Sequence, residues 1–336
     1  PASKEYRVHI GSGLLSQIGE MVSEITNDGK IAIISDSNVW PLYGKKALNS
    51  LRNAGYHNII SYVFPAGEES KNGQTYLALL NFLAESKLTR SDCIVALGGG
   101  VVGDLSGFAA SAYMRGIDFY NIPTTLLSQI DSSIGGKTAI NLGGVKNIVG
   151  AFYQPKKVLI DPDLLKTLPP RQIANGMAEA IKMSLTSDKE LFELFETQDI
   201  KRNLEEIILR SLNIKKSVVE QDEKEAGLRK ILNFGHTVGH GIESTSELYH
   251  GEAVALGMLP MCSETLRPRV IKVLKKCNLY RELQYDWDRI TQAAFHDKKA
   301  DGGSVTVTLV QEPGTYELKT MDRLDVMEQA RACLEG

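Results

Sequence analysis

The sequence predicts an α/β protein in which an N-terminal, Rossmann-like doubly wound domain is followed by a mainly α-helical domain. In the first half, short β-branched runs alternate with amphipathic stretches, as in a largely parallel sheet with helices on both faces. After Asp161-Pro162, helical periodicity continues with few strand signals. A chain of 336 residues with 43% hydrophobic content has room for two cores. We therefore expect an α/β domain at residues 1–162 and a helical domain at residues 163–336.

The individual elements follow from hydrophobic periodicity and from turn residues. Apolar runs predict strands at residues 30–36, 58–63, 92–97, 119–122 and 158–160. Amphipathic stretches predict helices at residues 14–25, 43–54, 76–87 and 105–114, and then at 172–185, 189–195, 204–219 and 228–244. Near the end, residues 305–310 and 315–319 flank Glu312-Pro313-Gly314, which indicates a hairpin with a Pro-Gly turn.

Bulk properties exclude several classes of partner and location. The net charge of −3 provides no global basic field for nucleic acid or an anionic membrane. Four cysteines lie far apart without a CxxC pair, which favours a reducing compartment, the cytoplasm, over a disulfide framework or a thiolate zinc site. No stretch approaches the roughly 18 apolar residues of a membrane span, and the first residues lack the apolar region of a signal peptide, so we expect neither export nor anchoring.

A glycine-rich segment, Gly98-Gly-Gly-Val-Val-Gly-Asp104, follows an apolar strand and leads into a helical pattern. Glycines in that context let backbone N–H groups approach a phosphate at a helix N-terminus, where the helix dipole also favours negative charge. A tight strand-to-helix turn needs the same glycines. Taken alone, the motif therefore leaves pyrophosphate binding and a purely structural turn equally open.

Three of the six histidines, His236, His240 and His250, are clustered in the sequence. His236 and His240 are spaced i, i+4, so on a helix they share one face, as two metal ligands or as a ligand and an acid–base group. A single helical histidine is more often structural, but imidazole is the commonest metal ligand and no cysteine lies nearby. We therefore favour a functional cluster.

Glu179 and Lys182 lie one turn apart in an otherwise apolar helical pattern. One interpretation is a surface ion pair, worth about 0.2–0.5 kcal/mol. Their apolar neighbours, such as Met177 and Ile181, favour a partly buried carboxylate instead. That carboxylate would complete a two-histidine, one-glutamate metal site with an open position, as catalytic metals require.

Cationic and amide side chains occur near these motifs. Individually each is more often a solvated surface group. Together, in a chain of net negative charge, they would supply a local field that holds a phosphate and a carboxylate. The residues are Arg115, Lys137, Lys146, Asn147, Lys215, Arg229 and Asn233.

In combination, the motifs resemble one family, the 3-dehydroquinate synthases of the sugar phosphate cyclase superfamily. The resemblance runs from about Gly67 to Gly257. Six ordered segments carry it: Gly67-Glu-Glu-Ser-Lys71, the glycine-rich segment, Pro123-Thr-Thr-Leu-Leu-Ser-Gln-Ile-Asp-Ser-Ser-Ile-Gly-Gly-Lys137, Gly176-Met-Ala-Glu-Ala-Ile-Lys182, Leu232-Asn-Phe-Gly-His-Thr-Val-Gly-His240 and His250-Gly-Glu-Ala253.

The resemblance implies cofactors and their ligands. It places zinc, or cobalt, on Glu179, His236 and His250, so the C-terminal domain holds the metal. It makes the N-terminal domain an NAD-binding domain. The residues implied for NAD are Asp36, Glu68, Lys71, Gly100, Val101, Asp104, Thr124, Thr125 and Thr167, with Asp131, Lys137 and Lys146 where the nicotinamide meets the substrate.

For the substrate, the resemblance implies a small phosphorylated sugar acid and a homodimeric enzyme. His240 remains available for acid–base work. The other residues implied for catalysis are Lys182, Glu225, Arg229 and Asn233. Those implied for substrate binding are Arg115, Lys137, Asn147, Lys215 and one of Lys298 and Lys299, of which we expect Lys298.

The implied reaction converts 3-deoxy-D-arabino-heptulosonate 7-phosphate into 3-dehydroquinate and phosphate in the shikimate pathway, the route to the aromatic amino acids. A ring hydroxyl is oxidised, phosphate is eliminated, the alcohol is restored, and an opened ring closes in an intramolecular aldol step. NAD is regenerated in each turnover, and the metal acts as a Lewis acid.

Three alternatives remain open. A sister cyclase, such as an aminodehydroquinate, deoxy-scyllo-inosose or epi-valiolone synthase, would share the fold. Arg229, Asn233 and His240 suit a substrate carboxylate and argue against the carboxylate-free substrates, but not against the amino variant. A metal-dependent polyol dehydrogenase would release NADH. A non-enzymatic binding module would leave the open metal site without a purpose.

Overall fold

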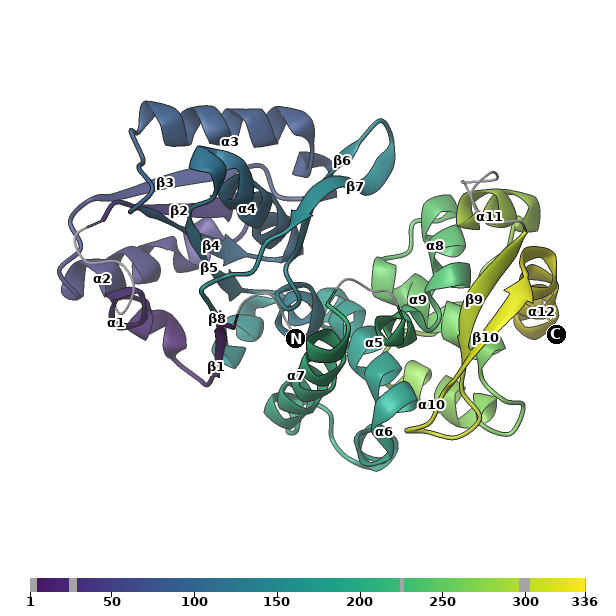
Figure 1. The fold of residues 1–336 in the computed structure, drawn as a ribbon. Coiled ribbons are helices and arrows are strands. Elements are labelled where there is room, and N and C mark those ends of the chain that lie inside the picture. Colours follow the sequence, from purple (N-terminus) through teal and green to yellow (C-terminus); the bar gives the residue numbers. More distant parts are fainter. Residues whose placement is uncertain (1–4, 24–28, 224–226, 296–302, 336) are drawn as a thin grey trace. The chain divides into compact units, whose positions relative to one another are not determined.

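The computed structural model describes residues 5–23, 29–223, 227–295 and 303–335. The chain divides into two compact units, residues 3–168 and residues 169–336, which we call the N-terminal unit and the C-terminal unit (Figure 1). Across the described residues, no helix combines the length and the apolar character needed to cross a membrane.

A six-stranded parallel sheet forms the centre of the N-terminal unit, in the order β1-β8-β5-β4-β2-β3. The five expected strands are confirmed. The additional strand β1 lies at the sheet edge, and its four residues are half exposed, which explains its weak sequence signal. The strands are β1 (Arg7–Ile10), β2 (Ile31–Asp36), β3 (Ile59–Phe64), β4 (Cys93–Gly98), β5 (Asp118–Pro123) and β8 (Lys157–Ile160).

Helices cover both faces of this sheet, as expected for a doubly wound fold (Figure 1). The α-helices are α1 (Ile18–Ser23), α2 (Lys45–Asn53), α3 (Gly73–Glu85) and α4 (Gly100–Ala112). Short helical turns occur at η1 (Leu14–Gln17), η2 (Trp40–Gly44), η3 (Glu68–Ser70), η4 (Tyr113–Arg115), η5 (Ser128–Ser132) and η6 (Pro162–Thr167).

The N-terminal unit has a hydrophobic core on each face of the sheet, because successive side chains of a strand point to opposite faces. In β2, Ile31 and Ile33 pack on one face with side chains of α1 and α2. Ala32 and Ile34 pack on the opposite face with side chains of α3 and α4. Because both faces are buried, the strands read as continuous apolar runs, which is why they were recognisable in the sequence.

A two-stranded antiparallel hairpin, β6 (Lys137–Leu142) and β7 (Val145–Phe152), was not predicted. Its connection is Gly143-Gly144, and both glycines have positive φ, +60° and +81°. A two-residue loop with positive φ at both positions is the turn that suits the twist of a hairpin, and glycine adopts it without strain. The Gly-Gly pair was therefore the available sequence signal.

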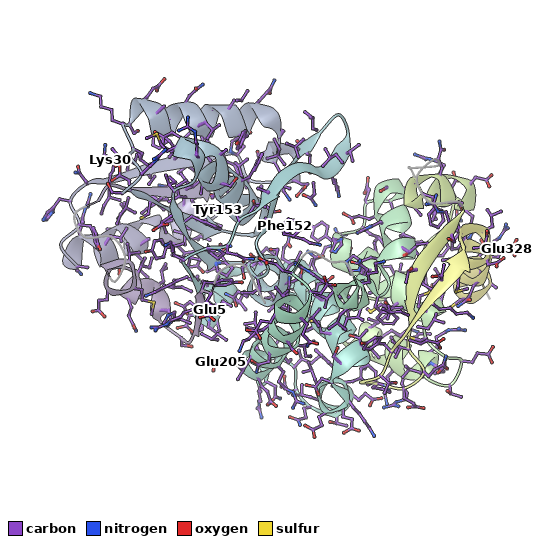
Figure 2. All side chains as sticks on the ribbon, in the orientation of Figure 1. Glu5, Lys30, Phe152, Tyr153, Glu205 and Glu328 are labelled. Atoms are coloured by element: carbon purple, nitrogen blue, oxygen red, sulfur yellow. The ribbon has the colours of Figure 1, made fainter. Side chains whose placement is uncertain are left out.

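The hairpin is attached to the rest of the N-terminal unit at its base. Tyr153, which Figure 2 labels, comes directly after β7. Its ring stacks on Phe119, and its hydroxyl donates a hydrogen bond to the Ile117 carbonyl. Helix α4 approaches β6 closely, since a Cβ added at Gly107 would lie 2.5 Å from Thr138 Cγ2. The residues of β7 are thereby held at a fixed position relative to α4.

The C-terminal unit is mainly helical, as expected, with one antiparallel hairpin of β9 (Ser304–Leu309) and β10 (Glu317–Asp322). The expected hairpin turn is confirmed, and Gly314 has a φ of +84°. The helices are α5 (Pro170–Ser187), α6 (Lys189–Thr197), α7 (Leu204–Gln221), η7 (Leu228–Asn233), α8 (His236–Thr245), α9 (His250–Met258), η8 (Leu259–Met261), α10 (Arg267–Lys276), α11 (Trp287–Ala294) and α12 (Arg323–Glu335).

The continuous helix expected at residues 228–244 is wrong. The chain forms the short turn η7, leaves helical geometry at Phe234 and Gly235, and starts α8 at His236. Gly235 has a φ of +78°, a left-handed conformation that glycine adopts readily and that interrupts a right-handed helix. The break places His236 at the N-terminus of α8 and leaves His236 and His240 one turn apart on the same helix.

Glycines allow α5, α8 and α9 to approach one another closely. A Cβ at Gly257 of α9 would lie 2.1 Å from the Gly235 carbonyl oxygen, and a Cβ at Gly239 of α8 would lie 2.9 Å from Val254 Cα. At the start of α9, a Cβ at Gly251 would lie 2.1 Å from the Asn175 carbonyl oxygen of α5. Backbone contacts of this kind fix the three helices at one spacing.

We predict that Gly257→Ala destabilises the protein by about 2 kcal/mol, because the added methyl group meets backbone atoms that cannot move aside. Urea unfolding in the presence of a chelator measures the effect without any contribution from a bound metal. Gly73→Ala is the matched control, because its Cβ meets no atom within 4 Å, and it should stay within about 1 kcal/mol of the wild type. Equal stability of the two variants would contradict the packing account.

Candidate active site

A buried carboxylate lies in the middle of α5. Glu179 is 1% exposed and Lys182 is 2% exposed, so the surface ion pair considered from the sequence is wrong. The ammonium of Lys182 contacts Glu179 Oε2. Glu179 Oε1 has no hydrogen-bond partner among the described residues. A buried carboxylate oxygen without a donor is costly unless a cation binds it.

Two histidines face this oxygen from the first residues of two other helices. His236 starts α8 and His250 starts α9. Their Nε2 atoms lie 3.7 Å and 3.5 Å from Glu179 Oε1. Two ligand atoms that each lie about 2.1 Å from a tetrahedral metal are about 3.4 Å apart. The donor set and its spacing therefore fit one divalent ion, and three protein ligands leave a position open.

Burial and nearby charges shift the pKa of all three residues. Burial opposes ionisation of Glu179, but Lys182 and the two histidines outweigh it and hold the pKa of the carboxyl well below its usual value. Burial, reinforced by Lys182, also keeps the pKa of His236 well below its ordinary value, so this ring is neutral at pH 7. Burial lowers the pKa of His250, but Glu179 and Glu243 together raise it to about 9.

The third histidine lies beside the other two. The His240 ring centroid is 5.1 Å from that of His236 and 5.8 Å from that of His250, and the side chain is exposed. It is not part of the group formed by Glu179, His236 and His250. His240 is thus close enough to exchange a proton with a molecule bound at the metal position.

A carboxylate that the sequence analysis did not single out contacts the cluster. Glu243 Oε2 lies 2.9 Å from His250 Nδ1. Glu243 follows His240 by three positions and His236 by seven, so its place on the histidine face of α8 was the available signal. Its partner, however, lies on a different helix, and sequence spacing does not indicate that contact.

A second buried carboxylate, Glu252, fixes the start of α9, where His250 lies. Glu252 is fully buried and accepts hydrogen bonds from Arg171 Nε and Nη2, from Arg281 Nη2 and from the Tyr249 backbone N–H. Gly251 N–H in turn donates to Asn175 Oδ1 at 2.6 Å. These bonds hold the first turn of α9 against α5.

The remaining residues expected in the C-terminal unit have different environments. Lys215 lies buried on α7, which packs against α5. Arg229 is buried in η7 and donates a hydrogen bond to the Glu223 carbonyl at 2.6 Å. Asn233 is exposed at the end of η7. Glu225 and Lys298 lie outside the described residues.

In the N-terminal unit, the glycine-rich segment forms a strand–turn–helix junction. It leads from the carboxyl end of β4 directly into α4, which begins at Gly100. A Cβ at Gly99 would lie 2.9 Å from Thr125 Cγ2, and one at Gly100 would lie 3.1 Å from Ser132 Oγ. Since the first turn of a helix leaves N–H groups without intrahelical acceptors, this cradle fits a pyrophosphate.

The junction lies at the point where the strand order reverses. Strand β4 follows β3 in the chain but pairs with β2 on the opposite side. In open α/β sheets, ligands bind at such a switch point, outside the carboxyl ends of the strands. Asp36 ends β2 there, and its carboxylate accepts hydrogen bonds from the backbone N–H groups of Asn38 and Val39.

A polar network connects four of the expected residues next to this junction. The ammonium of Lys71 contacts the Asp104 carboxylate and donates to Asn147 Oδ1 at 2.5 Å. Asn147 N–H donates to Asn141 Oδ1, and Asn141 Nδ2 donates to Glu68 Oε1. The buried lysine thereby links α4 to the β6–β7 hairpin.

The other expected residues are more dispersed. Thr124 and Thr125 follow β5, and the Thr124 N–H bonds to the Gly98 carbonyl. The Thr167 hydroxyl lies 2.5 Å from the Tyr43 hydroxyl. Val101 lies in the first turn of α4, Asp131 in η5, and the exposed Lys137 and Lys146 on the hairpin. Arg115 lies past the opposite end of α4, about 20 Å along the helix from the glycines.

Two family models match consecutive parts of the chain. The model described as 3-dehydroquinate synthase N-terminal matches residues 61–175, and the one described as 3-dehydroquinate synthase C-terminal matches residues 176–300. The 3-dehydroquinate synthase of Lactococcus lactis subsp. cremoris is 45% identical, over 93% of this chain and 93% of its own length.

Two solved structures resemble the whole chain. A 2-deoxy-scyllo-inosose synthase complexed with carbaglucose-6-phosphate, NAD+ and Co2+ has a TM-score of 0.88 and 27% identity, covering 99% of this chain and 98% of its own. The 2-epi-5-epi-valiolone synthase of Streptomyces hygroscopicus subsp. jinggangensis, with NAD+ and Zn2+ bound, has a TM-score of 0.86 and 28% identity, covering 100% and 98%.

We predict that Glu252→Gln lowers stability by about 2 kcal/mol at about pH 7, because hydrogen bonds to a charged acceptor are lost. Burial raises the pKa of Glu252, but the bonds from Arg171 and Tyr249 outweigh it and leave the pKa below its usual value. The carboxylate therefore stabilises the fold above the unfolded pKa of about 4.3, and this contribution is lost as the pH falls through the folded pKa. Urea midpoints should converge for the two proteins as the pH falls through the folded pKa, and a constant difference would contradict this role.

Proposed function

Because the chain belongs to the 3-dehydroquinate synthase family, we propose that it converts 3-deoxy-D-arabino-heptulosonate 7-phosphate into 3-dehydroquinate and phosphate. The enzyme is then a carbon–oxygen lyase of the shikimate pathway. The observation that carries the proposal is the group of the buried Glu179 with the partly buried His236 and His250, an open three-ligand site of the kind that catalytic metals use.

Glu179, His236 and His250 would hold the divalent metal. When bound, the metal supplies a Lewis acid for oxygen atoms of the substrate. The fit rests on Glu179 Oε1, which accepts no hydrogen bond from the part of the chain that the structure describes, and on the Nε2 atoms that lie 3.5 and 3.7 Å from it. Lys182 balances the carboxylate charge, and its ammonium would stabilise a departing phosphate.

The glycine junction at the start of α4 would hold NAD, with Gly100 and Val101 offering backbone donors to its pyrophosphate. When bound, NAD supplies a hydride acceptor that becomes a hydride donor later in the same turnover. Lys71 and Asp104 hold each other in place through their ion pair, and Asn147 completes their hydrogen bonding. We further propose NAD contacts for the remaining members of the set, Asp36, Glu68, Thr124, Thr125, Asp131, Lys137, Lys146 and Thr167.

The substrate carries a phosphate and a carboxylate, and the chain offers buried cations for both. Lys215 and Arg229 are each nine-tenths or more buried, where ionic contacts are strong because water does not screen them. His240 would take and return protons at an imidazole nitrogen. We propose that Asn233 and Glu225 assist catalysis and that Arg115, Lys137, Asn147 and Lys298 contact the substrate.

The choice between dehydroquinate and a sister product rests on relatedness and on charge. The 45% identity is to a dehydroquinate synthase, whereas the two sister cyclases are 27% and 28% identical. A guanidinium such as Arg229 matches the geometry of a carboxylate, which the carboxylate-free sugar phosphates lack. A sister cyclase, including an aminodehydroquinate synthase, is the second candidate.

We extend the proposal to zinc as the native metal, to a homodimer and to the cytoplasm. All four cysteines, Cys93, Cys262, Cys277 and Cys333, are free thiols, as in a reducing compartment. Sedimentation at twice the chain mass of 36.9 kDa would support the dimer. A species of the single-chain mass at micromolar concentration would rule it out.

With catalytic amounts of NAD and with zinc or cobalt, the purified protein should release phosphate from 3-deoxy-D-arabino-heptulosonate 7-phosphate. Dehydroquinate should form in equal amount without net NADH, and chelation should abolish both reversibly. Turnover of glucose 6-phosphate or sedoheptulose 7-phosphate instead would move the protein to a sister cyclase. Net NADH formation from a simple alcohol would make it a dehydrogenase.

His250→Ala should weaken metal binding by more than about 100-fold. Removing a residue that only hydrogen-bonds to a metal ligand typically weakens binding by about 10–100-fold, and removing the ligand itself should weaken it more. Phosphate release should fall with it. His57→Ala, which removes an exposed histidine ahead of β3, is the matched control and should leave both unchanged. Normal metal affinity in His250→Ala would refute the ligand assignment.

A further inference from the structure

The contact between Glu243 and His250 joins two helices next to the metal ligands. Glu243 Oε2 lies 2.9 Å from His250 Nδ1, within hydrogen-bonding distance. The opposite nitrogen of the same ring, Nε2, faces Glu179 Oε1 at 3.5 Å. The Glu243 side chain is 14% exposed and the His250 side chain is 29% exposed, so the contact between them is largely shielded from water.

From this geometry we propose that Glu243 is a positioning residue for His250. The proposal rests on the metal-binding part of the proposed function. An Nδ1–H that donates to the carboxylate fixes the ring tautomer and leaves the lone pair on Nε2. It also fixes the ring rotation, so that Nε2 points at the position shared with Glu179 and His236. A carboxylate acceptor raises the basicity of a ligating imidazole as well.

The surrounding packing makes Glu243 a well-placed acceptor. Glu243 and His236 are seven positions apart on α8, so one helix carries both a ligand and the acceptor for the other histidine. Close glycine contacts hold α8 against α9, and hydrogen bonds of Glu252 hold the start of α9. The Glu243 carboxylate and the His250 ring therefore lie on two helices, α8 and α9, whose relative position is fixed.

Glu243 could act instead as a ligand, because His240, Glu243 and His250 form a second group of suitable spacing. The two roles use different nitrogens of His250. A metal in the second group would take Nδ1, whereas a positioning carboxylate requires a proton there. Substitution by glutamine separates these roles, since its amide oxygen still accepts an N–H hydrogen bond but is a poor metal ligand.

Co2+ binding by Glu243→Ala and Glu243→Gln, measured by competition with a chelator, tests the proposal without any turnover. The alanine variant should bind about 10–100-fold more weakly and the glutamine variant less than about tenfold more weakly. Glu220→Ala removes an exposed glutamate from α7 and should bind as the wild type does. Circular dichroism of the metal-free variants verifies folding.

Nitrogen-15 NMR of the zinc-loaded protein reports the protonation of His250 Nδ1, which would not change if Glu243 had only a structural role. The wild type and Glu243→Gln should show a protonated Nδ1 on His250 with a slowly exchanging proton, and Glu243→Ala should lose that protection. Wild-type affinity in Glu243→Ala, or equal loss in both variants, would overturn the proposal. Failure of the proposed function would look different: wild-type protein that binds metal tightly but forms no dehydroquinate.

Discussion

The C-terminal unit is organised around one negative charge held out of water. Glu179 lies among apolar neighbours in α5, where an isolated carboxylate would shift its pKa upward and lose its charge. Lys182 supplies one compensating cation, and the two histidines facing Oε1 leave room for a second, a metal. Close glycine packing of α5, α8 and α9 is needed because imidazoles from two helices must reach the same oxygen.

The sequence predicted the features that depend on residues close together in the chain, such as buried strands and spacing along one helix. The buried strands were recognisable as apolar runs. The prediction that His236 and His240 share one helix face is confirmed, because both lie on α8. The break at Gly235 was missed, because helical periodicity continues across it while only tertiary packing requires its positive φ. The Glu243–His250 and Glu252–Arg171 contacts were also missed, since each joins side chains whose approach depends on how separate helices pack.

The fold alone does not determine which sugar phosphate the protein uses. Two cyclases with other products share nearly the whole architecture. Discrimination must come from the few side chains that contact the substrate, a role that we propose for the buried Arg229. In this proposal, the metal and the cofactor site provide the chemistry that the family shares, and the local cations determine which substrate reacts.

X-ray absorption spectroscopy of the zinc-loaded protein tests the central claim most directly, because it reports the metal's ligands without assuming a reaction. The account predicts one zinc per chain with two imidazole nitrogens and oxygen donors at about 2.0–2.2 Å. Glu179→Gln should lose that zinc. A sulfur neighbour at about 2.3 Å, or an unchanged spectrum in Glu179→Gln, would contradict it.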